Sequence, residues 1–171
     1  MESLEKAGLA VNYNRVSSTR GRSLPSKVYI WDETLRDGEQ TPGVALTIEE
    51  KIEIAKALDD VGVSIVVVGF PAVSEAEKRT VAAITREGLS RATIGAPARA
   101  VVSDIDACIE AGVQEVPIFI ATSDFRLKYQ LRMSRDEMLE RLVECVEYAK
   151  DHGLTTTYIA EDSTRSDMDF L

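Results

Sequence analysis

From residue 28 onward, short apolar runs alternate with longer stretches in which apolar residues recur every three or four positions. The short runs have the length of buried strands, and the longer stretches are typical of amphipathic helices. The predicted strands are residues 28–31, 64–70, 92–96, 115–121 and 155–160. Because strands and helices alternate, we expect the strands to lie parallel, in the order of the sequence, joined by right-handed crossovers.

Four helices are predicted between these strands. Each begins at a Ser or Thr that is followed three residues later by an acid, the pattern of a capping box, and each ends at a glycine. The pairs are Thr47 with Glu50, Ser74 with Glu77, Ser103 with Asp106 and Ser134 with Glu137, and the closing glycines are Gly62, Gly88, Gly112 and Gly153. Residues 167–171 are expected to begin a fifth helix.

Two α/β architectures fit this alternation, a doubly wound open sheet and a (β/α)8 TIM barrel. No G-x-G-x-x-G motif follows the first strand, which disfavours a dinucleotide-binding sheet. Polar clusters follow the first, fourth and fifth strands, where a barrel keeps its active site. A full barrel needs about 250 residues, so we expect residues 27–171 to supply about its first five β/α units. Residues 1–26 lack periodicity and are expected to form a flexible N-terminal extension, with a transit peptide as an alternative.

Composition narrows the possible functions. The chain has 171 residues, 44% hydrophobic and 29% charged, and a net charge of −9 without a basic patch, which argues against nucleic-acid binding. No apolar run approaches the roughly 20 residues that cross a bilayer, and the leader lacks the apolar core of a secretory signal. Cys108 and Cys145 fall inside predicted helices and are interpreted as buried thiols of a cytoplasmic protein. His152, the single histidine, excludes a site built from several histidines of this chain.

The densest polar stretch is residues 31–40, WDETLRDGEQ, at the end of the first predicted strand. Carboxylates at a strand end can hold a divalent cation, and Arg36 beside Asp37 can stabilise a developing oxyanion. An ordinary charged turn is the alternative interpretation.

Four motifs stand out, at residues 36–40 (RDGEQ), 69–74 (GFPAVS), 119–124 (FIATSD) and 161–167 (EDSTRSD). Together they resemble the 2-isopropylmalate synthase and homocitrate synthase family. That resemblance implies a metal-dependent Claisen-condensing TIM-barrel enzyme. Its activity would be that of an acyltransferase, joining acetyl-CoA to a 2-oxo acid to give a 2-substituted malate. The implied cofactor is a divalent metal, Mg²⁺, Mn²⁺ or Zn²⁺.

The resemblance also suggests roles for individual residues. Asp37 matches a metal-binding carboxylate, Arg36 a catalytic arginine beside the carbonyl, and Glu161 a catalytic carboxylate on the substrate side. The residues expected to bind substrate are Gln40, Arg99, Thr122 and Ser163. A surface arginine at the start of a helix is an equally good interpretation of Arg99. Gln40 matches the motif but has no assigned chemical role.

The sequence departs from the family pattern in places. Val67 stands where the family commonly has Glu, and Arg126 where it often has His. Arg126 is either an exposed loop residue or a cation that favours a more anionic acceptor, such as a dicarboxylate or a phosphonate-bearing acid. The family's His-x-His metal pair would lie beyond residue 171, and His152 is a poor substitute. The isolated chain is therefore expected to bind metal weakly and to be inactive.

Alternative functions remain open from the sequence. A related carbon–carbon lyase could use the same site in the reverse direction. A non-catalytic partial barrel could instead assemble with another chain or with itself, because five strands leave two open sheet edges. The expected partners are acetyl-CoA and a 2-oxo acid, with no nucleic acid and no membrane, and a homodimer is expected.

Overall fold

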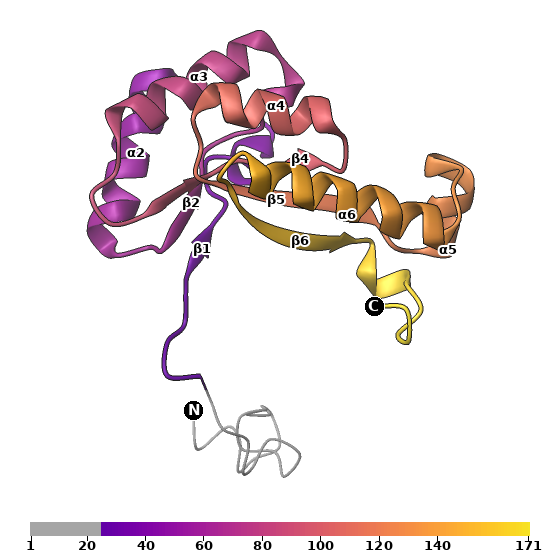
Figure 1. The fold of residues 1–171 in the computed structure, drawn as a ribbon. Helices are drawn as coiled ribbons and strands as arrows, with labels where there is room; N and C mark the ends of the chain where they lie inside the picture. The colour runs from indigo at the N-terminus through magenta and orange to yellow at the C-terminus, as the bar shows by residue number, and fades with distance from the viewer. Residues whose placement is uncertain (1–24) are drawn as a thin grey trace.

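The computed structural model describes residues 25–171, so most of the predicted extension at residues 1–26 lies outside the described residues. One six-stranded parallel sheet organises this part of the chain. Its strands are β1 (Trp31–Asp32), β2 (Ile65–Val67), β3 (Thr93–Gly95), β4 (Ala98–Arg99), β5 (Glu115–Ala121) and β6 (Thr155–Glu161). Figure 1 shows the helices lying along one side of the curved sheet.

The strand order confirms the predicted succession. β1 pairs with β2, β2 with β3, β3 with β5 and β5 with β6, without the reversal that a doubly wound sheet requires. The short β4 continues β3 along the same edge of β5 and was not predicted separately. The described chain is therefore the parallel half-barrel expected of the N-terminal part of a TIM barrel.

The principal helices follow the predicted pattern. They are α2 (Ile48–Val61), α3 (Glu75–Glu87), α4 (Val102–Ala111) and α6 (Arg135–Asp151). Complete capping boxes lie at the starts of α2, at Thr47, and α6, at Ser134. At the start of α3, the Ser74 hydroxyl accepts a hydrogen bond from the Glu77 backbone amide. Gly62 and Gly112 close α2 and α4 in the left-handed conformation.

The predicted start of α4 is wrong. Val101 is the N-cap, without a side-chain cap, and Ser103 lies inside the helix. The reason is Asp104, whose buried carboxylate turns back to accept hydrogen bonds from the backbone amide and side chain of Arg99. This contact replaces the predicted pair of Ser103 with Asp106.

Three other segments differ from the prediction. Strand pairing at the first strand begins with the carbonyl of Ile30, and Val28 and Tyr29 are exposed because no residue between 25 and 171 covers them. Residues 167–171 form turns held by Asp167, not a helix. The loop after β5 is largely helical, with α5 (Asp124–Arg126) and a π-helical segment, η5 (Leu127–Leu131). The short 3-10 segments are η3 (Gly38–Gln40), η4 (Pro71–Val73) and η6 (Ser163–Arg165).

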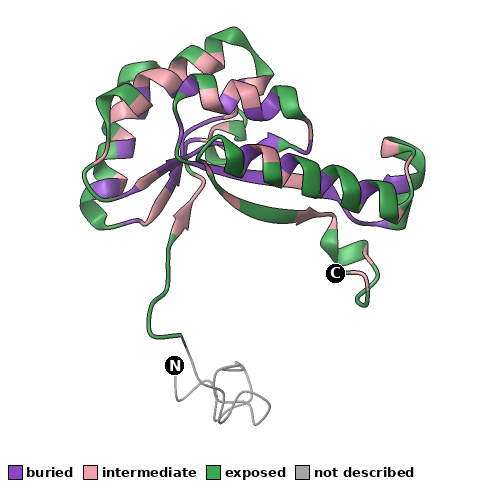
Figure 2. Cartoon of the chain, viewed as in Figure 1, coloured by how far each residue is buried: buried purple, intermediate pink, exposed green. Residues whose placement is uncertain are grey.

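The core lies between the sheet and its helices (Figure 2). Successive helices pack against one another, and their apolar faces cover β2, β3 and β5. Cys108 and Cys145 are buried free thiols in α4 and α6, as predicted. β6 is much more open, since Tyr158 is 43% and Ile159 38% exposed. None of the helices between residues 25 and 171 has the length and apolar composition needed to cross a bilayer.

Candidate active site

A tight turn follows β1 and carries the first group of predicted site residues. The Glu33 carbonyl accepts hydrogen bonds from the backbone amides of Arg36 and Gly38, both at 3.1 Å. Asp32 fixes the start of the turn by accepting the Thr34 amide at 2.9 Å. Leu35 is fully buried and anchors the turn in the core. Arg36 and Asp37 are therefore presented at the carboxyl end of β1.

A hollow of about 230 Å³ lies at the carboxyl ends of the strands. It brings together three predicted site residues, Arg36, Asp37 and Glu161, which come from opposite ends of the described sequence. Arg36 and Asp37 form an ion pair. The other lining residues are Glu33, Pro97, Phe119 and Ile159. The hollow thus combines a cation, several carboxylates and apolar walls, as a site for a small polar acid requires.

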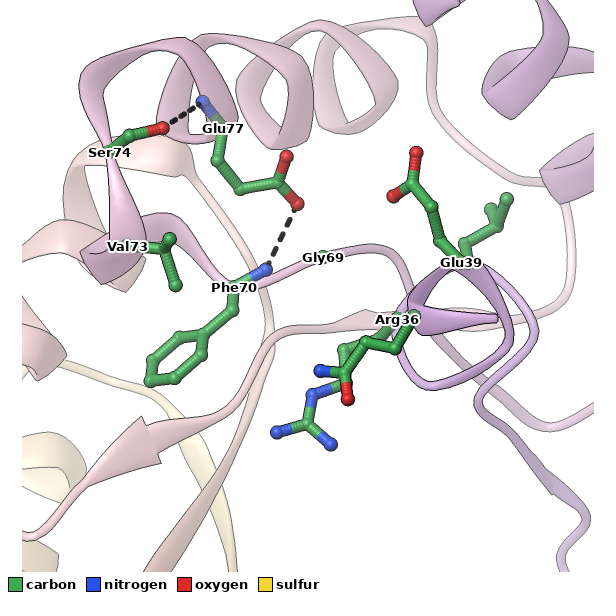
Figure 3. A pocket seen from close by; sticks show the side chains of 9 residues that line it. Arg36, Glu39, Gly69, Phe70, Val73, Ser74 and Glu77 are labelled. Atoms are coloured by element: carbon green, nitrogen blue, oxygen red, sulfur yellow. Dashed lines mark hydrogen bonds between the residues drawn. The ribbon is translucent and has the colours of Figure 1, made fainter. Parts of the chain in front are cut away.

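Arg36 stands between this hollow and a second one. The second hollow, of about 250 Å³, is lined by Arg36, Glu39, Gln40, Phe70 and Glu77 among others (Figure 3). The guanidinium carbon lies 6.0 Å from the centre of the Phe70 ring. Within residues 25–171 the buried Nε of Arg36 has no hydrogen-bond partner. Arg36 therefore keeps donor capacity that a bound anion can use.

Glu33 is a member of this site to which the sequence assigned no role. Its Oε1 accepts a 2.8 Å hydrogen bond from the Trp31 indole, whereas its buried Oε2 has no partner in the described part of the chain. Burial is the main cause that raises the pKa of the Glu33 carboxyl above its usual value. The one available signal was its position two residues after Trp31, which places both side chains on the same side of the chain.

Glu161 ends β6 and forms an ion pair with Arg126, with 2.5 Å between Oε1 and Nη1. The Arg126 side chain is 23% exposed, so it is a half-buried neighbour of the site and not a fully exposed loop residue. Next to it, Asp162 accepts hydrogen bonds from Arg165 and from Ser123, which hold the pKa of the Asp162 carboxyl below its usual value.

Thr122 and Ser163 occupy different environments. The Thr122 hydroxyl is buried, lies 2.6 Å from the Ser166 hydroxyl and donates to the Glu161 carbonyl at 3.3 Å. Ser163 is exposed at the start of η6. Neither lines the hollow shared by Arg36, Asp37 and Glu161, so their substrate-binding roles remain predictions.

Arg99 and Gln40 lie outside that hollow as well. The Arg99 side chain forms two bonds with Asp104, Nε to Oδ2 at 2.6 Å and Nη2 to Oδ1 at 2.8 Å, and these bonds raise the pKa of Arg99. It borders a separate depression between α3 and α4. Gln40 is exposed at the rim of the second hollow. The structure does not bring either residue into the group formed by Arg36, Asp37 and Glu161.

The described residues fit a metal ion only partly. Asp37 offers a carboxylate that is 56% exposed, but residues 25–171 contain no group of three His, Cys, Asp or Glu side chains that could hold a metal. His152 is exposed at the end of α6, where its Nδ1 lies 2.8 Å from the Tyr148 carbonyl. This part of the chain therefore presents one candidate ligand and not a coordination set.

Similar sequences support the synthase resemblance. The chain is 56% identical over 148 residues to a probable 2-isopropylmalate synthase of Methanopyrus kandleri, covering 86% of this chain and 30% of that protein. It is 51% identical to homocitrate synthase AksA of the same organism, covering 90% of this chain and 38% of that protein. The chain thus spans about a third of the length of these curated relatives.

Solved structures support the fold. The hydroxymethylglutaryl-CoA (HMG-CoA) lyase of Bacillus subtilis matches with a TM-score of 0.62 at 24% identity, covering 78% of this chain and 46% of the lyase. The hydroxymethylglutaryl-CoA lyase of Pseudomonas aeruginosa matches with a TM-score of 0.60. The HMGL-like family profile matches residues 27–171, almost the whole described region. Together with the parallel half-barrel and its carboxyl-end site, these matches show that the chain belongs to the HMGL-like family.

Proposed function

We propose that residues 27–171 form the N-terminal part of the catalytic barrel of an acyltransferase that condenses acetyl-CoA with a 2-oxo acid to give a 2-substituted malate. The observation that carries the proposal is the meeting of Arg36, Asp37 and Glu161 in one hollow. Identity of about half the residues to synthases adds the reaction class.

The reaction places specific demands on these residues. The methyl carbon of acetyl-CoA gives a proton to a base and bonds to the carbonyl carbon of the acceptor, whose oxygen becomes an alkoxide and then takes up a proton. Water then cleaves the thioester and releases coenzyme A. Arg36 donates hydrogen bonds to the developing alkoxide, because a guanidinium stays protonated and keeps its donors. Glu161, held by Arg126, orients the acceptor from the wall of the same hollow.

Asp37 is the proposed ligand of a divalent metal, Mg²⁺, Mn²⁺ or Zn²⁺. Asp37 would hold such a metal, which would supply Lewis-acid polarisation of a carbonyl oxygen. The described residues supply a single ligand, so the chemistry proposed for this chain is that of Arg36 and Glu161. Asp37 also holds Arg36 through their ion pair, which orients the guanidinium.

The test is turnover of acetyl-CoA by the intact protein with a panel of 2-oxo acids, followed by release of free thiol and by identification of the product. Thiol release that depends on one acceptor supports the proposal. Cleavage of the corresponding hydroxy-acyl-CoA without condensation would replace it with the lyase alternative. Absence of both activities, in a folded protein supplied with each metal in turn, would favour the non-catalytic partial barrel.

A further inference from the structure

A buried lysine lies behind the candidate site. Lys51, on α2, is 2% exposed, although lysine is rarely buried without charged partners. Its Nζ lies 2.5 Å from Oε2 of Glu39 and 3.6 Å from Oε2 of Glu77. Glu39 belongs to η3, the turn that follows Arg36 and Asp37, and Glu77 lies in the first turn of α3. One ammonium therefore joins three segments that are distant in the sequence.

The other oxygen of each carboxylate holds a loop. Oε1 of Glu39 accepts the Leu46 amide at 3.3 Å, in the segment that leads into α2. Oε1 of Glu77 accepts the Phe70 amide at 3.2 Å, in the loop that follows β2 (Figure 3). Each carboxylate thus bridges Lys51 to a backbone amide beside the site.

Gly69 gives independent support for a fixed Glu77. Its φ is +148°, and a Cβ at this position would collide with the Glu77 carboxylate and lie 2.9 Å from Cγ2 of Val81. Only glycine leaves the room that the carboxylate needs to reach the Phe70 amide. The loop after β2 and the start of α3 therefore fit each other around this charged group.

Lys51 contacts the turn that carries Glu39 and the start of α3 that carries Glu77, and these two segments line the second hollow together with Arg36. Arg36 precedes Glu39 by three residues, and its guanidinium faces the Phe70 ring. That ring in turn packs edge-on against Phe119, with 5.9 Å between ring centres, and Phe119 lines the hollow. We propose that Lys51 is a positioning residue, whose ammonium fixes the Arg36 turn against the Phe70 loop and so sets the place of the guanidinium in the site.

Charge balance explains why a cation is needed at this point. Without Lys51, the Glu39 and Glu77 carboxylates would face each other with their opposing charge removed, and two like charges that are partly buried repel strongly. The two loops would then separate, and Arg36 would move with its own turn. The catalytic part of this inference rests on the proposed function, whereas the coupling of the loops does not.

The test uses Lys51→Met in the intact protein, because methionine keeps most of the stem and removes the ammonium. Lys56→Met is the matched control, since Lys56 lies on the same helix and loses only an exposed ion pair with Glu87. We expect amide hydrogen exchange at Phe70 and Leu46 to accelerate about tenfold or more in Lys51→Met and to stay unchanged in Lys56→Met. We expect kcat to fall about tenfold, a part of the loss that removal of an oxyanion donor causes, with a smaller change in KM. Lys51→Arg should restore part of both effects.

Each result decides the inference. Unchanged exchange at Phe70 and Leu46 in folded Lys51→Met overturns it, and so does faster exchange with unchanged kcat. If Lys51→Met does not fold, Glu39→Gln takes its place, because the amide oxygen still accepts from Leu46 and only the contact with Lys51 weakens. Glu39→Gln with wild-type kcat and wild-type exchange would then reject the role. If the wild-type protein turns over no acceptor, the proposed function fails, and the exchange measurements alone decide the coupling of the loops.

Discussion

Buried polar atoms lie at both ends of the sheet, and those of Asp59 differ from those of Glu33 and Arg36 in their hydrogen bonding. At the amino end, Asp59 of α2 is 5% exposed, and its carboxylate accepts four hydrogen bonds from residues 90–92 at 2.6 to 2.9 Å. At the carboxyl end, buried atoms of Glu33 and Arg36 have no partners within residues 25–171. Satisfied polar groups stabilise the fold, whereas unsatisfied groups are available to a ligand. Asp59 at the amino end therefore stabilises the fold, whereas Glu33 and Arg36 at the carboxyl end keep atoms that a ligand can use.

The carboxyl groups at the two ends respond to this difference. The hydrogen bonds from Ser90, and then those from the neighbouring amides, hold the pKa of Asp59 well below its usual range. Burial without sufficient hydrogen bonding raises the pKa of Glu33. The Asp59 carboxyl is thus kept charged at the amino end of the sheet. The Glu33 carboxyl at the carboxyl end is shifted towards its neutral form.

The largest expected effect is at the carboxyl end. Arg36→Ala should lower kcat by roughly 10²–10³, the loss typical of removing one oxyanion donor. Stability should change little, because the half-buried side chain contributes little to the core. Steady-state kinetics and a thermal melt of the intact protein measure the two quantities. If Arg36→Ala greatly lowers stability, and the molecules that remain folded keep full specific activity, Arg36 is a structural residue.

The next effect is at the amino end. Asp59→Asn should lower the free energy of unfolding by about 3 kcal/mol. In the wild type, backbone amides of residues 90–92 donate to both carboxylate oxygens, and in the variant some of them would face the NH2 group of asparagine. Specific activity of the folded protein should not change. A depressed pKa means that the charged group stabilises the fold above its unfolded pKa of about 4. The difference between variant and wild type should therefore shrink as the pH falls below about 4.

Urea unfolding at several pH values checks this prediction. A difference that stays constant down to pH 3 would mean that the charge of Asp59 does not matter. A loss of kcat equal to that of Arg36→Ala, at unchanged stability, would contradict the assignment of separate roles to the two ends of the sheet.

Local sequence signals predicted much of the fold. The boxes at Thr47 and Ser134 mark the starts of α2 and α6, because capping uses contacts only three residues apart. The same pattern at Ser103 failed, since the longer contact between Asp104 and Arg99 sets the start of α4. Residues 28–30 have a strand-like composition but are exposed in the described part of the chain, which composition cannot reveal.

The grouping of three candidate site residues was predictable from the sequence, whereas their roles remain predictions. Arg36 and Asp37 follow β1 and Glu161 ends β6, and parallel strands bring such ends together. The pairing of Arg126 with Glu161 and the burial of Lys51 depend on side chains that are far apart in sequence, so no local pattern contains them. The expected role of Arg99 rested on its position after a strand, and that position did not indicate its bonds to Asp104.

A third prediction concerns the acceptor. Arg126 is a half-buried cation next to Glu161, so an acceptor with a second anionic group would gain from it. Arg126→Gln should lower kcat/KM for dicarboxylic 2-oxo acids about tenfold, which is about 1.4 kcal/mol, and should affect monocarboxylic ones much less. Competition assays with matched pairs of acceptors measure the ratio. Equal losses for both classes would show that Arg126 serves only to hold Glu161.

The smallest predicted effects separate a real helix cap from an apparent one. Thr47→Ala should destabilise the protein by about 1 kcal/mol, because the Thr47 hydroxyl accepts the Glu50 amide at the start of α2. Ser103→Ala should change stability by less than about 0.5 kcal/mol, because Ser103 lies within α4 and caps nothing. Denaturant unfolding of both variants provides the comparison, and neither should alter kcat. A loss for Ser103→Ala as large as that for Thr47→Ala would show that α4 begins at the serine in solution. The hydrogen bonds that Arg99 donates to Asp104 would then not determine where this helix begins.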